Sequence, residues 1–297
     1  MSESITPGGP RDPREGPQPP FPEQQQPAPG SEAELRPQAD HGEEGYRGSG
    51  KLEGLATIIT GGDSGIGRAV ALAFAREGAN VLISYLDEHD DAAATARLVE
   101  SAGRKAVTVS GDISDPGHCR SIVERAVGEF GRLDVLVNNA ATQSLHESFS
   151  EITDAEVERI FRTNVFPVFA LCRAAVPYLP AGGAIVNSVS IQAFDPSPAL
   201  LHYASSKGAL VTFTKGLAKE LVEQGIRVNA VAPGPVWTPL IASTTSPATA
   251  ASFGQDNPMG RPAQPAELAP AYVFLASADA TFITGEVIGV TGGRLLT

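Results

Sequence analysis

Cysteine, basic residues and long apolar runs are scarce in this sequence of 297 residues. The two cysteines, Cys119 and Cys172, fall in segments with a helical pattern, so we expect neither a disulfide framework nor a metal site. Lys and Arg number 22 against 34 acids, and the net charge of -12 without any basic cluster argues against a nucleic-acid surface. No apolar stretch reaches the ~18 residues of a membrane span. The acidic balance makes a small-molecule or protein partner the better expectation. The N-terminus lacks a basic flank followed by an apolar run, so we expect a cytoplasmic protein.

The first 46 residues differ in composition from the rest of the chain. They hold ten of the 24 prolines and nine acids against three arginines, with few aliphatic residues. Such a segment cannot bury enough apolar surface to offset the entropy of ordering it. Residues 1–46 are therefore predicted to form a Pro-rich tail. The tail is either disordered in solvent or extended, with residues 35–46 lying across the folded body or a neighbouring subunit.

From residue 47 onward, short β-branched runs alternate with longer helical patterns. Seven strands are predicted, at 56–59, 80–85, 105–109, 135–137, 184–188, 227–231 and 287–290. Six helices are predicted between them, at 66–77, 90–102, 116–130, 154–178, 203–223 and 265–276. Repeated strand and helix units imply one doubly wound α/β domain of the Rossmann type over residues 47–297. Its seven-stranded parallel sheet carries helices on both faces, and ligands of such sheets bind at the carboxyl ends of the strands.

The clearest local signal is the turn Thr60-Gly61-Gly62-Asp63-Ser64-Gly65-Ile66-Gly67, which follows a predicted strand and opens a predicted helix. Glycines permit a tight turn and let the backbone approach an anion closely. The N–H groups at the start of a helix, together with its dipole, favour negative charge there. In this setting the turn predicts a cradle for the phosphate groups of a dinucleotide.

Further motifs follow the turn in a fixed order. They are Asp112-Ile113 after the third predicted strand, Asn138-Asn139-Ala140-Ala141 after the fourth, Asn164 in a long helix, Ser190 after the fifth strand, Tyr203-Ala204-Ser205-Ser206-Lys207, and Pro233-Gly234-Pro235-Val236-Trp237-Thr238 after the sixth. With the glycine turn, these motifs resemble the short-chain dehydrogenase/reductase family from about Lys51 to the C-terminus. The Pro-rich leader and Ser190-Ile191-Gln192-Ala193 are similar to a bacterial subgroup with a long N-terminal extension, some of whose members are described as stress proteins or aldehyde reductases. The resemblance implies an NAD(P)-dependent oxidoreductase that transfers a hydride between nicotinamide and a carbonyl or alcohol substrate.

The residue types of the Tyr203 motif support this chemistry. Tyr203 and Lys207 are four residues apart on a predicted helix, so both project from one face. An ammonium group there favours tyrosinate and is expected to lower the phenol pKa from about 10. Tyr203 is then the acid that protonates the developing alkoxide, and Ser190 hydrogen-bonds the same oxygen. By the resemblance, Asn164 completes a water-linked proton path to Lys207.

The resemblance also assigns the contacts of the cofactor. The turn residues that approach the pyrophosphate are Gly61, Ser64, Gly65, Ile66 and Gly67. The remaining contacts are Asp112 and Ile113 at the adenine, Asn139 and Ala140 along the ribose, Tyr203 and Lys207 at the nicotinamide ribose, and Pro233, Gly234, Val236 and Thr238 beside the nicotinamide.

The tip of the second predicted strand bears on the choice between NAD and NADP. Tyr85 and Leu86 stand where NAD enzymes carry an acid that binds the ribose hydroxyls and repels the extra phosphate of NADP. The missing acid gives NADP a slight advantage over NAD. Arg68 lies nearby but also occurs in NAD enzymes, and Asp87 and Glu88 oppose a phosphate.

Residues 239–261 are rich in Ser, Thr, Ala and Pro and are predicted to form a mobile lid over the substrate. By the resemblance, residues 285–293 form a subunit contact, and a homotetramer is expected. Two alternative functions stay open. One is a dinucleotide-binding redox sensor, and the complete set of Asn164, Ser190, Tyr203 and Lys207 speaks against it. The other is an isomerase or dehydratase on the same fold, which consumes no net cofactor.

Overall fold

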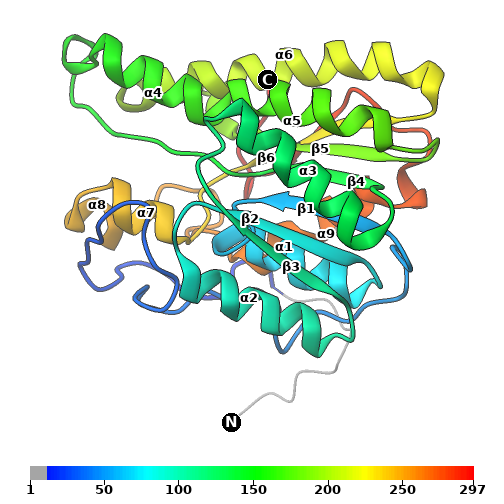
Figure 1. Ribbon diagram of the computed structural model, residues 1–297. Coiled ribbons are helices and arrows are strands. Elements are labelled where there is room, and N and C mark those ends of the chain that lie inside the picture. The colour runs from blue at the N-terminus through cyan, green and yellow to red at the C-terminus, as the bar shows by residue number, and fades with distance from the viewer. Residues whose placement is uncertain (1–11) are drawn as a thin grey trace.

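Seven strands form one parallel sheet in the computed structural model, which describes residues 12–297 (Figure 1). They are β1 (Ala56–Thr60), β2 (Asn80–Tyr85), β3 (Ala106–Ser110), β4 (Val135–Asn138), β5 (Ala184–Ser188), β6 (Arg227–Pro233) and β7 (Val287–Val290). Their order across the sheet is β3-β2-β1-β4-β5-β6-β7. The direction of winding reverses between β1 and β4, and ligands of doubly wound sheets bind at such a switch point. The predicted doubly wound fold is confirmed.

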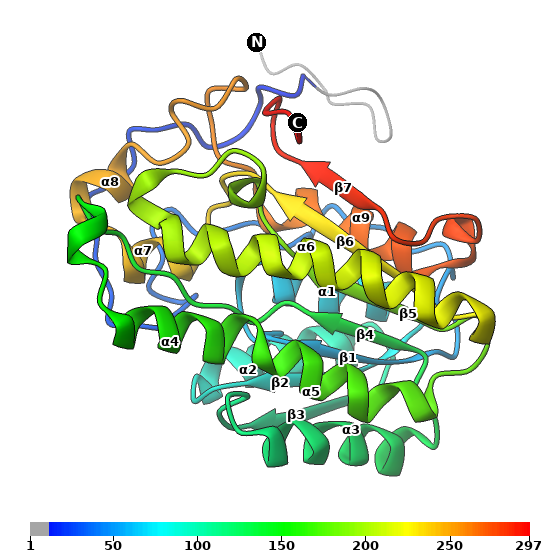
Figure 2. The same cartoon turned by 90° about the horizontal axis from the view of Figure 1, so that it is seen from above.

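Helices cover both faces of the sheet (Figures 1 and 2). One face carries α1 (Gly65–Arg76), α2 (His89–Ser101) and α9 (Pro265–Ala276), and the other carries α3 (Pro116–Phe130), α4 (Asp154–Asn164), α5 (Phe166–Ala175) and α6 (Leu201–Leu221). Alternate residues of a strand serve the two cores. Val135 and Val137 of β4 pack on the α1 side, whereas Leu136 between them packs on the α3 side. Both cores are apolar, so the strands read as continuous apolar runs.

The predicted helix over residues 154–178 is in fact two helices, α4 and α5, followed by a short 3-10 turn. Pro167 stands in the first turn of α5 and has no N–H to continue the hydrogen bonding of α4. Val165 between the helices takes φ -114° and ψ -56°, outside the ideal helical range. The break follows Asn164 directly, so it places this residue at the end of a helix rather than within one.

Residues 12–46 lie extended along the body beside α7 (Pro239–Thr244) and α8 (Pro247–Ala251), as the blue segment of Figure 1 shows. Phe21 and Leu35 are buried against Trp237, which is itself fully buried. Trp237 Nε1 donates a hydrogen bond of 2.8 Å to the carbonyl oxygen of Pro37. Of the two alternatives for the tail, residues 12–46 take the extended one. Residues 1–11 lie outside the described part.

The composition of the tail favours disorder, but a few apolar residues are enough to pack it against the body. Phe21 and Leu35 supply the apolar contacts, and the body satisfies part of the tail's backbone. The N–H of Phe21 donates to Ala251 O at 2.8 Å, and that of Gln26 donates to Ala242 O at 2.9 Å. An extended segment can therefore order on an existing surface without a core of its own.

The segment predicted as a lid, residues 239–261, begins with the short helices α7 and α8. Ile241 and Ala242 of α7 belong to the same buried cluster as Leu35. The lid and the tail thus form one packed unit at the carboxyl ends of the strands.

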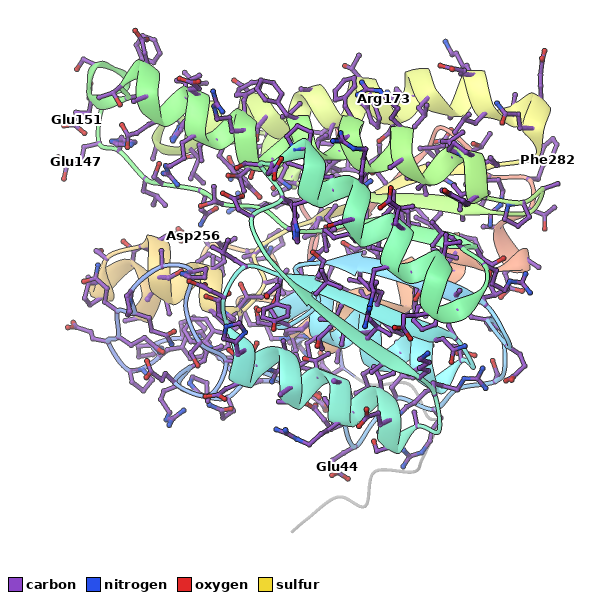
Figure 3. All side chains as sticks on the ribbon, viewed as in Figure 1. Glu44, Glu147, Glu151, Arg173, Asp256 and Phe282 are labelled. Atoms are coloured by element: carbon purple, nitrogen blue, oxygen red, sulfur yellow. The ribbon has the colours of Figure 1, made fainter. Side chains whose placement is uncertain are left out.

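Within residues 12–297, no helix is both long and apolar enough to cross a membrane. Acidic side chains project from the outer edge of the molecule, as Glu44, Glu147 and Glu151 do in Figure 3. These charges face solvent, in keeping with the acidic composition.

Candidate active site

The glycine turn joins β1 to α1 in a conformation that needs its glycines. Gly61 has φ +60° and Gly65 has φ +49°, both in the left-handed region. A Cβ atom on Gly67 would lie 1.8 Å from the carbonyl oxygen of Gly61, so this glycine serves the close packing of the turn. Gly67 does not line the cavity described below, whereas the other predicted pyrophosphate residues do.

Asn139 holds the turn in place from the end of β4. Its backbone N–H donates to Thr60 Oγ1 at 2.9 Å, and its Nδ2 donates to the carbonyl oxygens of Thr60 and Gly61 at 3.1 and 3.2 Å. Ser188 at the end of β5 donates to Asn139 Oδ1 at 3.0 Å. One side chain therefore links the carboxyl ends of three neighbouring strands.

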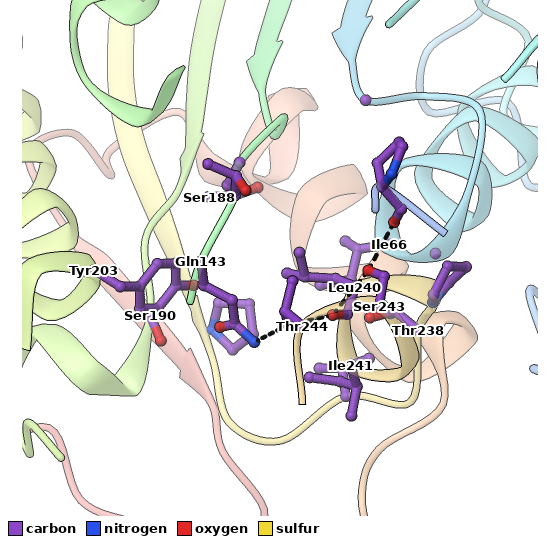
Figure 4. A pocket seen from close by; sticks show the side chains of 18 of the residues that line it. Ile66, Gln143, Ser188, Ser190, Tyr203, Thr238, Leu240, Ile241, Ser243 and Thr244 are labelled. Carbon is purple, nitrogen blue, oxygen red and sulfur yellow. Dashed lines mark hydrogen bonds between the residues drawn. The ribbon is translucent and has the colours of Figure 1, made fainter. Parts of the chain in front are cut away.

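A cavity of about 780 Å³ opens at these strand ends. Seventeen of the nineteen residues predicted for the site line it: Gly61, Ser64, Gly65, Ile66, Tyr85, Leu86, Asp112, Ile113, Asn139, Ala140, Ser190, Tyr203, Lys207, Pro233, Gly234, Val236 and Thr238. Gly67 and Asn164 are the two that do not. In Figure 4, Ser190 and Tyr203 stand on one side and Ile66 and Thr238 on the other. Glycine backbone and the N-terminal turn of α1 at the wall suit the pyrophosphate of a dinucleotide.

Tyr203 and Lys207 project into the cavity from the first turns of α6, as their spacing predicts. Both are buried, with 8 % and 2 % of their surface exposed. Lys207 Nζ donates to the carbonyl oxygen of Ser188 at 2.8 Å and lies 5.6 Å from the centre of the Tyr203 ring. The backbone of β5 thereby fixes the ammonium group next to the phenol.

The expectation of a lowered phenol pKa is wrong for this structure. Burial raises the pKa of Tyr203 to about 12, against the opposing effect of its hydrogen bond with Ser190. Burial also lowers the pKa of Lys207 to about 8. The spacing of the two residues indicated a neighbouring ammonium group, but it gave no sign of the desolvation that burial of the phenol imposes. At neutral pH Tyr203 is therefore a protonated acid beside a charged lysine.

Asn164 lies behind the cavity, fully buried at the end of α4. Its Oδ1 accepts from the N–H of Thr142 at 2.8 Å, and its Nδ2 donates to Thr142 O at 2.9 Å and to Ser206 Oγ at 3.1 Å. Asn164 therefore holds the loop after β4 against α6. Its contact on α6 is Ser206, the residue before Lys207. Within the described residues, the hydrogen bond found for Lys207 Nζ is the one to Ser188.

The end of the cavity expected to hold the adenosine is lined by several acidic residues, although Tyr85 and Leu86 at the tip of β2 include none. Asp63 and Glu88 line it together with Asp112. Burial raises the pKa of Asp63 to about 6 and that of Glu88 to about 7. Arg68 does not line the cavity, because its guanidinium donates to Asp63 O, Thr95 Oγ1 and Asp91 Oδ1 at 2.9 to 3.1 Å. The cation nearest to the turn in sequence is thus engaged elsewhere.

Several lining residues carry no signal in the sequence. Gln143 Nε2 donates to Thr244 Oγ1 of α7 at 2.9 Å, which joins the loop after β4 to the lid (Figure 4). Ala28 and Pro29 of the N-terminal segment line the cavity as well, and Ser243 donates to Pro29 O at 3.0 Å. No motif marks these positions, because only the packing of distant segments brings them to the site.

Comparison with known proteins agrees with this arrangement. The sequence profile of a family described as enoyl-(acyl carrier protein) reductase matches residues 61–294. The chain is 49 % identical to the uncharacterized oxidoreductase YhdF of Bacillus subtilis, over 93 % of this chain and 95 % of the relative. It is 42 % identical to the chloroplastic NADPH-dependent aldehyde reductase 1 of Arabidopsis thaliana, over 90 % of this chain and 96 % of the relative. The crystal structure of 3-ketoacyl-(acyl-carrier-protein) reductase from Brucella melitensis complexed with NADH superposes with a TM-score of 0.75 at 35 % identity, covering 82 % of this chain and 99 % of that one.

Proposed function

The chain belongs to the short-chain dehydrogenase/reductase family and is an NAD(P)-dependent oxidoreductase, and we propose that it reduces aldehydes or ketones with Tyr203 as the proton donor. The observation that carries the proposal is the group of Ser190, Tyr203 and Lys207 at the wall of the cavity. The aldehyde reductase named among the relatives supports a carbonyl substrate.

The chemistry needs a proton at the oxygen of the carbonyl group. When bound, the nicotinamide supplies the hydride for the carbonyl carbon. Tyr203 Oη gives its proton to the oxygen as negative charge develops there, and Ser190 Oγ donates a hydrogen bond to the same atom. The hydroxyl of Tyr203 is protonated at neutral pH, as a proton donor must be. Its raised pKa makes it a weak acid, so the proposal relies on Lys207 to stabilise the tyrosinate.

Lys207 restores the proton of Tyr203 in this scheme. Its ammonium group lies beside the phenol and stabilises the tyrosinate that remains after proton transfer. Asn164 orients Ser206 and the loop at Thr142, and we assign it the water-linked path to Lys207 that the family resemblance implies. The ammonium also supplies a donor for the hydroxyls of the nicotinamide ribose.

The proposal covers both nicotinamide cofactors. The strand tip at Tyr85 and Leu86 lacks an acid, which favours NADP. Asp63 and Glu88 line the same end of the cavity, and Arg68 is engaged with Asp91, which favours NAD. Since these observations oppose each other, titrations of NADPH and NADH side by side decide the preference.

A homotetramer in the cytoplasm completes the proposal. Phe166 and Phe169 on α5 expose about half of their surface, at 55 % and 45 %, which supports an apolar contact with another subunit. Light scattering on the purified chain tests the tetramer. The cytoplasmic location stays a prediction from the sequence, and cell fractionation tests it.

The test of the proposed function is the oxidation of NADPH and NADH in the presence of a panel of aldehydes and ketones. We expect steady turnover with at least one carbonyl compound and formation of the matching alcohol. Tight cofactor binding without turnover of any carbonyl would favour the redox sensor. Conversion of a substrate without net change in NAD(P)H would favour the isomerase or dehydratase.

A further inference from the structure

The carboxylate of Glu32 lies directly behind the glycine turn. The residue belongs to the N-terminal segment, and only 1 % of its surface is exposed. Its Oε2 accepts a hydrogen bond of 2.7 Å from the backbone N–H of Gly65, the first residue of α1. His41 Nε2 lies 3.2 Å from the same oxygen, and the N–H of Glu32 donates to Asp91 Oδ2 at 2.8 Å. Glu32 is thus fixed from both ends.

The first backbone N–H groups of helix α1 have no hydrogen bond acceptor from an N-cap side chain or from an acid in the first turn. Its N-cap, Ser64, makes no side-chain capping bond, and no acid stands in its first turn. The first N–H groups of a helix have no partner within the helix and are satisfied by caps, water or ligands. Here Glu32 takes the N–H of Gly65, while Ile66 borders the cavity. The first turn is therefore shared between a carboxylate of the N-terminal segment and the anion that the cavity would hold.

The N-terminal segment, the lid and the turn meet at this point. A Cβ atom on Gly65 would lie 2.9 Å from Thr238 Cγ2, just before α7. A Cβ atom on Gly30 would lie 2.8 Å from Pro239 O, at the start of the same helix. Glu32 is two residues beyond Gly30, so the same stretch of the N-terminal segment contacts both the turn and the lid.

From this geometry we propose that Glu32 is a positioning residue of the cofactor site. It holds the Gly65 end of α1 so that the remaining donors of the first turn face the pyrophosphate of NAD(P). His41 balances its charge. The inference rests on the NAD(P)-dependent function and adds the N-terminal segment to the machinery that binds the cofactor.

The charge of Glu32 faces several ionisable groups. His41 lies between Glu32 and Glu43, with Nδ1 3.1 Å from Glu43 Oε1. Arg68 is paired with Asp91 at 3.1 Å. Burial acts to lower the pKa of His41, but Glu32 and Glu43 outweigh it and raise that pKa above its ordinary value. Burial acts to raise the pKa of Glu32, but His41 and the Gly65 N–H hold it low.

The sign of the pH effect follows from this pairing. Below the raised pKa of His41, the imidazolium compensates the carboxylate beside the phosphate cradle. As the pH rises through that pKa, the carboxylate loses its compensation and repels the anionic cofactor. Binding of the dinucleotide therefore weakens at high pH through Glu32. Asp63 also titrates near the turn. Because it is present in the wild type and in the Glu32 variants, its effect cancels when their Kd values are compared.

The test is a fluorescence titration of NADH and NADPH with the full chain, from pH 6.0 to 9.0, without any carbonyl substrate. At pH 6.0, where the His41 imidazolium compensates the carboxylate, we expect Glu32→Ala to raise Kd about tenfold, in line with the loss of one charge-assisted hydrogen bond. Glu32→Gln keeps an oxygen acceptor for Gly65 and removes the charge, so at pH 6.0 its Kd stays within about twofold of the wild type. The ratio of wild-type Kd to Glu32→Gln Kd rises with pH as His41 loses its proton, since effects common to both proteins cancel.

Glu34→Ala is the matched control, because Glu34 is an exposed acid of the same segment. Its Kd equals that of the wild type. A Glu32→Ala Kd within about twofold of the wild type at pH 6.0, or a ratio that stays constant with pH, overturns the proposal. If Glu32→Ala does not fold, the pH dependence of the Glu32→Gln ratio decides alone. Failure of the carbonyl assay would overturn the proposed function and leave this titration unaffected.

Discussion

The two ends of the cavity are built in different ways. At the catalytic end, Tyr203 and Lys207 come from adjacent turns of α6, and the backbone of β5 fixes the lysine. At the pyrophosphate end, the turn between β1 and α1 receives a hydrogen bond acceptor from Glu32, which lies outside the sheet and its helices. Catalytic geometry is thus a local property of one helix and one strand. At the pyrophosphate end, by contrast, the turn is completed by a side chain from a distant segment of the chain.

The ends also differ in charge. The catalytic end holds one lysine next to a phenol whose pKa burial raises to about 12. Behind the pyrophosphate end, Glu32, His41, Arg68 and Asp91 form a buried network of opposite charges. Substitutions at the first end should change the rate of the chemical step, and those at the second should change affinity for the cofactor.

The largest expected effect is that of Tyr203→Phe. The substitution removes the proton donor and keeps the packing of the ring, so turnover should fall by ~10³ to 10⁴ while the cofactor Kd stays within about twofold. Steady-state kinetics and a fluorescence titration measure the two quantities. Tyr178→Phe, at an exposed tyrosine, is the control and should retain full activity. Retention of turnover by Tyr203→Phe would remove Tyr203 from the mechanism.

Ser190→Ala comes next in size. Loss of one hydrogen bond to the developing oxyanion should lower kcat by ~10² to 10³. Ser190→Thr keeps the hydroxyl group and should recover part of the rate. Equal rates for the two variants would show that the hydroxyl does not act on the substrate oxygen.

Leu35→Ala tests the docking of the segment. Loss of this buried side chain beneath Trp237 should destabilise the protein by about 2 to 4 kcal/mol. Because Trp237 is the one tryptophan in the sequence, its fluorescence reports on the contact directly and should shift to the red. Denaturant unfolding measures the stability, and Leu295→Ala, at an exposed leucine near the C-terminus, is the control. An unchanged emission spectrum and midpoint would contradict the packing of residues 12–46 on the lid.

The pH profile of carbonyl reduction gives the smallest effect. Burial lowers the pKa of Lys207 to about 8, so the ammonium is present below that pH and lost above it, whereas Tyr203 stays protonated. We expect kcat/KM to fall about tenfold for each pH unit above 8. Lys207→Arg should abolish this fall in kcat/KM above pH 8, since a guanidinium stays charged. Its rate below pH 8 should be lower than that of the wild type, because a guanidinium cannot return a proton to Tyr203. If kcat/KM of Lys207→Arg fell above pH 8 in the same way as that of the wild type, the fall would be due to the titration of another group.

The sequence predicted most of the residues that line both ends of the cavity and missed the contribution of the N-terminal segment. The alternation of strands and helices, the glycine turn and the spacing of Tyr203 and Lys207 are local patterns, and the structure brings the turn, Tyr203 and Lys207 to one cavity. Glu32 could not be found in this way, because its role depends on the folded position of a Pro-rich segment. The raised pKa of Tyr203 was missed for a similar reason, since spacing shows a neighbouring charge but not the depth of burial.

The most direct test of the difference between the two ends is a paired measurement on Tyr203→Phe and Glu32→Ala. For each variant, the cofactor Kd and the rate of hydride transfer at saturating cofactor are compared with the wild type. The account predicts that Tyr203→Phe loses ~10³ or more in rate with its Kd nearly unchanged. It predicts that Glu32→Ala raises Kd about tenfold at pH 6.0 with a rate within about twofold of the wild type. Loss of rate and affinity together, to a similar extent in both variants, would contradict it.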